Sequence, residues 1–244
     1  MGSDNIDKKT KIIADLERII PDKIPPYSKR LLQEHVLRYQ FVSKYIKGKT
    51  VLDVACGSGY GSYIIANSGA KKVYAADCDS KTISYAKKRY PHDNINYICT
   101  DAAKLSVANC LIDVVVSFET IEHLSKPKLF LKEMYRLLKR TGICIISTPN
   151  KHCSLEDNPY HLKEYTFSEF TNILEQYFPG KKYYFGQRKV IKPIISFYLF
   201  LKRYLPSVFL PLLRIRPWEK LNIIKINKKA THDYLYFIAV CYKN

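Results

Sequence analysis

A strand-like run that ends in closely spaced glycines constrains the fold more than any other feature of the sequence. Residues 51–61 read VLDVACGSGYG, so a short apolar stretch turns abruptly into a segment of small residues. The glycines permit a tight turn and open the backbone to a ligand, because no Cβ stands in the way. The pattern predicts a strand, a ligand-binding turn and a helix. It does not identify the ligand, since phosphate-binding folds share it.

Short apolar runs alternate with amphipathic stretches along most of the chain. We expect strands at Thr50–Val54, Lys72–Ala76, Ile95–Cys99, Ile112–Ser117, Gly142–Ser147, Lys182–Phe185 and Tyr234–Cys241. We expect helices at 28–46, Ser62–Ser68, Ser80–Arg89, Lys126–Leu138 and 167–178, the last with Ser168 as its N-cap. Alternation of this kind predicts an α/β fold of Rossmann type: a doubly wound, mostly parallel, seven-stranded sheet with helices on both faces.

The chain divides into a core and two segments of different composition. A polar segment, 1–27, precedes the expected core at 28–187, and the final strand of the core falls in 230–244. Between them, 188–229 reads as a C-terminal insertion, broken by four prolines. Its stretch 190–215 mixes apolar runs with Lys and Arg. That stretch either packs on its own core, closes over an acceptor, forms a homodimer contact or lies on an anionic membrane surface.

Composition limits the classes of function and location. The 244 residues carry a formal net charge of +18, which favours polyanions such as RNA or reflects a lysine-rich, solvated surface. Seven scattered cysteines without a CxxC pair exclude a disulfide framework or a zinc module. A polar start and the lack of a long apolar run predict a cytoplasmic protein, peripheral to the inner face of the membrane if 190–215 binds lipid.

Three acidic positions lie at or just after the ends of the first three expected strands, in order. Asp53 precedes the glycines, where a carboxylate suits an amino-bearing ligand, and Asp77 ends the second strand, where a carboxylate can accept both ribose hydroxyls. Asp101 and Ala102 follow the third strand, placed to meet an adenine amino group. Together these segments resemble the class I S-adenosylmethionine (SAM)-dependent methyltransferases, over roughly residues 29–186 and the last strand.

The resemblance implies a set of donor contacts. In that family, positions matching Asp53, Gly57 and Gly59 hold the methionine end, those matching Asp77 and Cys78 hold the ribose and adenine, and those matching Asp101 and Ala102 hold the adenine edge. Residues 34–41 also resemble the helix that precedes the glycine turn, so Tyr39 either closes over the donor or is a core aromatic. The expected SAM-binding residues are therefore Tyr39, Asp53, Ala55, Cys56, Gly57, Gly59, Tyr60, Asp77, Cys78, Asp101, Ala102, Phe118 and Glu119.

A second group of polar residues follows the fourth and fifth expected strands. Glu119 and Glu122 are three residues apart, so a helical turn places them on one face, beside His123. His161 lies in a loop after the next strand, at the same end of the sheet. Two carboxylates and imidazoles predict a site for Mg²⁺ or Mn²⁺. Alternatively, Glu119 contacts the donor, Glu122 and His123 orient the following helix, and His161 is a surface residue.

This ExxEH segment with a downstream His resembles two kinds of methyltransferase. One is the small-RNA 3′-terminal 2′-O-methyltransferases, whose matching Glu, Glu, His and His bind a divalent metal. The other is the ubiquinone-pathway and glycan-cluster O-methyltransferases, and the stretch 147–170 looks closer to the glycan-cluster enzymes.

We therefore expect SAM-dependent methylation of a hydroxyl on a sugar, glycan or glycosylated small molecule, assisted by a divalent metal. The expected catalytic residues are Glu119, His123 and His161, with His123 or His161 as the proton acceptor. The alternatives are 2′-O-methylation of an RNA 3′ end and a non-catalytic, SAM-binding partner protein.

Overall fold

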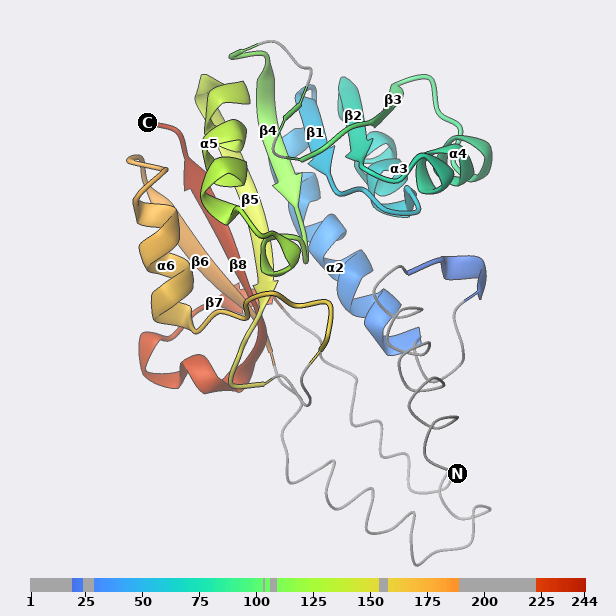
Figure 1. Cartoon of the computed structure of the whole chain (residues 1–244). Coiled ribbons are helices and arrows are strands. Elements are labelled where there is room, and N and C mark those ends of the chain that lie inside the picture. The colour runs from blue at the N-terminus through green and yellow to red at the C-terminus, as the bar shows by residue number, and fades with distance from the viewer. Residues whose placement is uncertain (1–18, 24–28, 103, 106–108, 154–157, 189–222) are drawn as a thin grey trace, which may run out of the picture.

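The fold is an α/β sandwich around one sheet (Figure 1). The computed structural model describes residues 19–23, 29–102, 104–105, 109–153, 158–188 and 223–244. In that part of the chain the sheet has eight strands in the order β3-β2-β1-β4-β5-β8-β6-β7. Their bounds are β1 Thr50–Val54, β2 Lys72–Asp77, β3 Ile95–Cys99, β4 Ile112–Ser117, β5 Leu138–Pro149, β6 Lys182–Arg188, β7 Ile223–Lys225 and β8 Tyr234–Tyr242.

Strand direction divides the sheet into two parts. The five strands from β3 to β5 in the spatial order are parallel to one another. β8 runs antiparallel to both β5 and β6, and β7 runs antiparallel to β6. The predicted doubly wound, mostly parallel sheet is therefore confirmed.

Helices cover both faces of this sheet. They are α2 Lys29–Ile46, α3 Tyr60–Asn67, α4 Ser80–Arg89, α5 Pro127–Leu137 and α6 Phe167–Glu175, with short 3₁₀ turns η1 Pro21–Lys23, η3 Ile121–His123 and η4 Lys228–Asp233. Figure 1 shows α5 and α6 on one face and α2 with α3 on the other. Because side chains alternate along a strand, Leu52 and Val115 join the core under α5 and α6, whereas Val51 and Val114 join the core under α2.

The structure differs from the expected elements at several places. The eighth strand, β7, falls inside the segment expected as an insertion, and its three residues are too few to show an alternating pattern. β5 begins at Leu138 rather than Gly142, because Leu138 pairs with Ile112 across a register shift. α3 begins at Tyr60, two residues earlier than expected.

The predicted N-cap of α6 was wrong. Thr166, not Ser168, caps the helix, because the Thr166 side chain accepts a hydrogen bond from the Glu169 N–H and the Glu169 side chain bonds back to the Thr166 N–H. This reciprocal pair is a capping box, a motif that requires an acidic or amide residue three positions after the cap. Ser168 has no such partner pattern in the sequence, since Thr171 stands three residues later.

The stretch 190–215, expected to contact membrane, acceptor or a second subunit, lies outside the described residues. Among the helices that are described, none has both the length and the apolar character needed to cross a bilayer.

Candidate active site

The site lies where the chain changes winding direction between β1 and β4. In open α/β sheets, ligands bind in the crevice outside the carboxyl ends of the strands at this point. A cavity of about 330 Å³ opens there, which is within the range of small-molecule sites. Its lining consists of Ile19, His35, Tyr39, Ala55, Cys56, Gly57, Ser58, Tyr60, Asp77, Phe118, Glu119, Thr120, His123 and Tyr160.

Two glycines shape the turn between β1 and α3. Gly57 and Gly59 have φ angles of 54° and 86°, a region that side-chain-bearing residues rarely adopt. A Cβ on Gly59 would lie 2.7 Å from the Cβ of Ala86, so this glycine lets α4 pack closely. A Cβ on Gly57 would meet nothing within 4 Å. Gly57 therefore leaves an open space at the cavity, as a ligand-cradling turn requires.

Asp53 is hydrogen-bonded to a residue of the cavity lining, Tyr39. Its carboxyl group is fully buried and accepts hydrogen bonds from the Ser62 hydroxyl at 2.6 Å and the Tyr39 hydroxyl at 3.4 Å. Asp53 is not among the lining residues, whereas Tyr39 is. Burial raises the pKa of Asp53 to about 7, an effect that the two hydroxyl hydrogen bonds only partly offset. Asp53, expected at the methionine end, therefore reaches the cavity lining only through its hydrogen bond with Tyr39.

Asp77 lines the cavity at the end of β2. Its carboxylate accepts hydrogen bonds from the Gly57 and Asp79 N–H groups, both at 3.0 Å. The residue after β3, Thr100, lies beside Asp77, because the Thr100 N–H donates to the Asp77 carbonyl at 2.9 Å. The other residues expected on this side do not line the cavity; they are Cys78, Asp101 and Ala102.

Glu119 lies on the cavity wall just after β4. It is held by Ser147 of the neighbouring strand β5: the Ser147 hydroxyl donates to Glu119 Oε1 at 2.6 Å and accepts from the Glu119 N–H at 3.3 Å. Glu119 has a φ of 49°, so the backbone bends sharply here to bring the carboxylate back toward β5. The side chain therefore faces the cavity in a fixed position.

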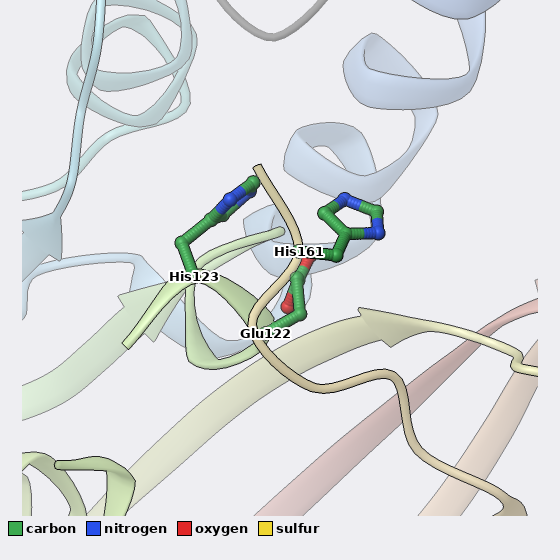
Figure 2. Close-up of side chains that lie close together, drawn as sticks. All are labelled: Glu122, His123 and His161. Carbon is green, nitrogen blue, oxygen red and sulfur yellow. The ribbon is translucent and has the colours of Figure 1, made fainter. Parts of the chain in front are cut away.

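Three of the four expected metal ligands come together. One ligand atom each of Glu122, His123 and His161 lies within 4.8 Å of the others (Figure 2). Glu122 and His123 belong to η3, and His161 belongs to the loop after β5. The Leu162 N–H donates to the Glu122 carbonyl at 2.8 Å, and this bond docks the loop onto η3. Glu119 lies outside this cluster.

The two histidines are oriented by partners on their Nδ1 atoms. His123 Nδ1 lies 2.9 Å from the Tyr160 carbonyl, and His161 Nδ1 lies 2.8 Å from Glu164 Oε1. Both partners are acceptors, so Nδ1 carries the proton in the neutral ring and Nε2 carries the lone pair. In His161, Nε2 also lies 3.1 Å from Asn158 Nδ2. This arrangement, with an acceptor behind each imidazole, is typical of metal-binding histidines.

Several residues of the cavity lining were not expected from the sequence. Ile19, His35, Ser58, Thr120 and Tyr160 line the cavity without having been expected there. A usable signal existed for His35, which lies one helical turn before Tyr39 and so on the same side of α2.

A buried arginine was also missed. Arg38 is fully buried, donates from Nη1 to Gln187 at 2.6 Å and lies over the Tyr236 ring at 4.2 Å. Burial lowers the pKa of Arg38, but the carboxylates of Glu119 and Glu34 raise it. The net effect is a raised pKa, so the guanidinium stays charged. The signal was an arginine in line with Val42 and Ile46 at four-residue steps, on the apolar side of the helix.

Comparisons with known proteins agree with this geometry. Residues 52–146 match the family model described as a methyltransferase domain. A probable SAM-dependent methyltransferase of Mycolicibacterium smegmatis is 30% identical over 178 residues, which is 67% of this chain and 68% of that protein. A ubiquinone biosynthesis O-methyltransferase of Coxiella burnetii is 31% identical over 158 residues, 62% of this chain and 66% of that protein.

A solved structure shares the fold at lower identity. The SAM-dependent methyltransferase of Thermotoga maritima, described as a possible histamine N-methyltransferase, superposes with a TM-score of 0.63 at 14% identity, over 89% of this chain and 94% of that one. The chain spans about three fifths to two thirds of the length of the curated relatives that it matches. The family match, the relatives and the glycine-lined cavity point the same way: the chain belongs to the SAM-dependent methyltransferases.

Proposed function

We propose that this methyltransferase transfers the methyl group of SAM to a hydroxyl of a sugar, a glycan or a glycosylated small molecule, with help from a divalent cation. The observation that supports the proposal is the cluster of Glu122, His123 and His161. His123 belongs both to this cluster and to the cavity lining. A cation in the cluster would therefore lie beside the donor, where an acceptor hydroxyl must be placed.

The cluster suits a cation with mixed ligand preferences. Imidazole nitrogens bind transition metals, whereas Mg²⁺ prefers oxygen ligands. Two imidazoles and one carboxylate therefore favour Mn²⁺ over Mg²⁺. When bound, the cation would lower the pKa of a chelated hydroxyl and fix its direction.

The protein's own groups have a limited task in the reaction. The sulfonium carbon of SAM is already activated, so the enzyme mainly has to align the acceptor oxygen with it. Ser147 holds Glu119 at the cavity wall, and Tyr39 packs edge-on against Phe118 with ring centroids 5.1 Å apart, so these lining groups have defined positions. Glu164 orients the His161 ring through its Nδ1 atom, so His161 is the candidate acceptor of the hydroxyl proton when it does not bind the cation.

The O-methyltransferase class has support from a relative. The Coxiella burnetii protein is a ubiquinone biosynthesis O-methyltransferase, and its similarity to this chain favours an oxygen acceptor. The sugar or glycan acceptor rests on the resemblance of residues 147–170 to glycan-cluster enzymes.

Metal binding is tested by titrating Mn²⁺ into the purified protein and following heat by calorimetry. We expect one site that weakens at least about 10-fold in Glu122→Gln and in His161→Ala, because each removes one ligand. His152→Ala is the matched control, since His152 is exposed and outside the cluster. Equal Mn²⁺ affinity in all four proteins would remove the cation from the proposal.

The acceptor is tested by transferring a labelled methyl group from SAM into a cell extract, with and without chelator, followed by ribonuclease. Label that resists ribonuclease and disappears with chelator supports a metal-assisted glycan or small-molecule acceptor. Label released by ribonuclease supports the alternative of an RNA 3′ end, which the net charge of +18 favours. SAM binding without any transfer supports the non-catalytic alternative.

A further inference from the structure

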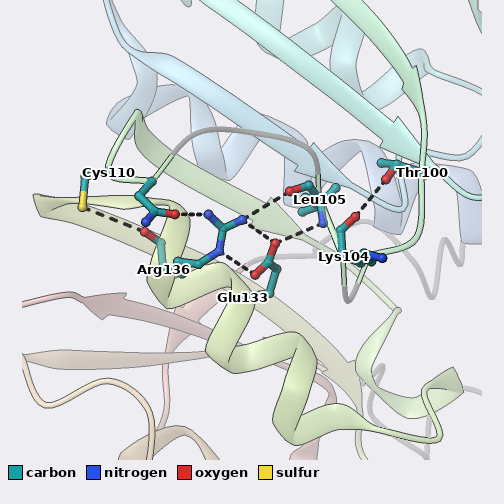
Figure 3. Close-up of polar contacts among 7 residues, drawn as sticks. Thr100, Lys104, Leu105, Cys110, Glu133 and Arg136 are labelled. Atoms are coloured by element: carbon teal, nitrogen blue, oxygen red, sulfur yellow. Dashed lines mark hydrogen bonds and ion pairs between the residues drawn. The ribbon is translucent and has the colours of Figure 1, made fainter.

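An ion pair on α5 anchors the loop that joins β3 to β4 (Figure 3). Glu133 and Arg136 lie one turn apart on the helix, and the Arg136 guanidinium donates to both carboxylate oxygens of Glu133, at 2.6 Å and 2.7 Å. Only 13% of the Glu133 side chain is exposed. The hydrogen bonds with Arg136 lower the pKa of Glu133, although burial raises it, so the pair stays ionised. Two-point contact of this kind fixes both side chains in one geometry.

The pair then binds the backbone of the loop from two sides. The Leu105 N–H donates to Glu133 Oε1 at 3.0 Å, and Arg136 Nη2 donates to the Leu105 carbonyl at 3.2 Å. Arg136 Nη1 also donates to the side chain of Asn109 farther along the loop. Both polar groups of one residue, Leu105, are therefore held by charged side chains. Leu105 itself is buried in the core under α5.

The anchored residue is close in sequence to the expected adenine edge. The Lys104 N–H donates to the Asp101 carbonyl at 3.0 Å, which closes a turn from Asp101 to Lys104, the residue before Leu105. At its other end the turn begins beside the cavity, because the Thr100 N–H donates to the carbonyl of Asp77. The turn is thus fixed at the cavity by β2 and at the far side by the Glu133–Arg136 pair.

We infer that Glu133 and Arg136 are positioning residues for the donor: by holding Leu105 they set the place of Asp101, and so the preference of the enzyme for adenine. This inference rests on the assignment of Asp101 to the adenine amino group, and it is independent of the acceptor and of the cation. A carboxylate selects adenine only if it is held within hydrogen-bond distance of the amino group. Because the Lys104 N–H bonds to the Asp101 carbonyl, a shift of Leu105 would move the backbone of Asp101 and its carboxylate with it.

The test compares two ligands in binding experiments without an acceptor. S-adenosylhomocysteine carries the adenine amino group, whereas S-inosylhomocysteine has an oxygen in its place. We expect the wild-type protein to bind the first at least about 10-fold more tightly, because the second leaves the Asp101 carboxylate facing an acceptor oxygen. Glu133→Ala should reduce this ratio to near one. Glu133→Gln, which keeps an acceptor for the Leu105 N–H, should reduce it less.

The ratio separates positioning from a general loss of stability. A variant that is only less stable has fewer folded molecules, but its folded molecules discriminate as before. Arg136→Lys gives a second, milder probe should Glu133→Ala fail to fold. Glu175→Gln, the same chemical change at an exposed site on α6, and Lys132→Ala on α5 should keep the wild-type ratio.

Two outcomes overturn the inference and are distinguishable. If the wild-type protein binds both ligands equally, or Asp101→Ala keeps the full preference, the assignment of Asp101 is wrong. If Asp101→Ala loses the preference while Glu133→Ala and Arg136→Lys keep it, the ion pair does not position the donor.

Discussion

Asp53 shows how one residue connects burial, pH and the donor cavity. Its carboxyl group is fully buried behind Tyr39, and burial raises its pKa to about 7 from the ordinary value of 3.8. The folded protein therefore holds a proton on Asp53 at pH values where the unfolded chain has released it. The stability that this proton contributes is fully present below about pH 4 and is lost as the pH rises through about 7.

The prediction concerns the pH dependence of the free energy of unfolding. Asp53→Asn removes the titrating group. The free energy of unfolding of Asp53→Asn, relative to that of the wild-type protein, should therefore be larger at pH 8 than at pH 5. Each unit between the folded and unfolded pKa values corresponds to about 1.4 kcal/mol, so a gain of a few kcal/mol is expected. Urea unfolding at both pH values measures it.

Asp93→Asn is the control for this experiment, because Asp93 is exposed. The prediction fails if the stability difference between Asp53→Asn and the wild-type protein is the same at pH 5 and pH 8.

At this scale the sequence identified residues that act through local spacing. Gly57 and Gly59 could be predicted because the turn and its glycines are contiguous. Arg38 could not be paired with Gln187, since the two are 149 positions apart and only the completed sheet brings them together. For the same reason the hydrogen bond between Asp53 and Tyr39 could not be predicted, since it depends on how α2 packs against β1.

Among the elements, α2 and α3 contact each other through a glycine. A Cβ on Gly61 would lie 2.0 Å from the ring of Tyr39. Gly61→Ala must therefore displace the ring or separate the helices, and overpacking of this kind costs about 1–3 kcal/mol. Since Tyr39 lines the cavity, binding of S-adenosylhomocysteine should weaken as well.

A double-mutant cycle assigns this effect to the contact. Tyr39→Ala removes the ring, so Gly61→Ala should cost less in that background, with a coupling energy of about 0.5–3 kcal/mol. Asn67→Ala, an exposed site on the same helix, controls for the introduction of alanine. Strict additivity of Tyr39→Ala and Gly61→Ala would contradict the packing explanation.

The capping box of α6 gives a second prediction for an element. Thr166→Ala removes the acceptor for the Glu169 N–H and should lower the free energy of unfolding by about 1 kcal/mol. Ser168→Ala should change it by much less, because Ser168 lies inside the helix. Equal losses in the two variants would contradict the assignment of Thr166 as the cap. Denaturant unfolding distinguishes these results.

The elements also show what limits prediction from sequence. Most strands and helices were expected close to their observed bounds, because their hydrophobic periodicity is a local property. β7 was not predicted, because a three-residue edge strand is defined by its pairing with β6 and not by its own hydrophobic pattern. The start of β5 at Leu138 was missed for the same reason, since the polar residues after Leu138 hide a pairing that the register with β4 determines.

For the whole molecule, the cavity brings together several segments at the carboxyl ends of the parallel strands. The cavity takes residues from α2, from the turn after β1, from the end of β2 and from the segment after β4. These segments are separate in the sequence, so the order of strands, which the alternation of elements predicted, is what places them together. The cluster of Glu122, His123 and His161 depends in addition on one loop docking onto η3.

A ligand that contacts all these segments must stabilise the whole fold. S-adenosylhomocysteine at 100 times its dissociation constant should add about 2.7 kcal/mol to the free energy of unfolding. For a chain of this length, that raises the melting temperature by roughly 5–11 °C. Asp77→Asn should reduce the shift, because Asp77 lines the cavity at the expected ribose position. Chelator should leave the shift unchanged, since the metal cluster serves the acceptor in our proposal. A shift that survives in Asp77→Asn but disappears with chelator would mean that the donor binds through the cation rather than through the glycine turn.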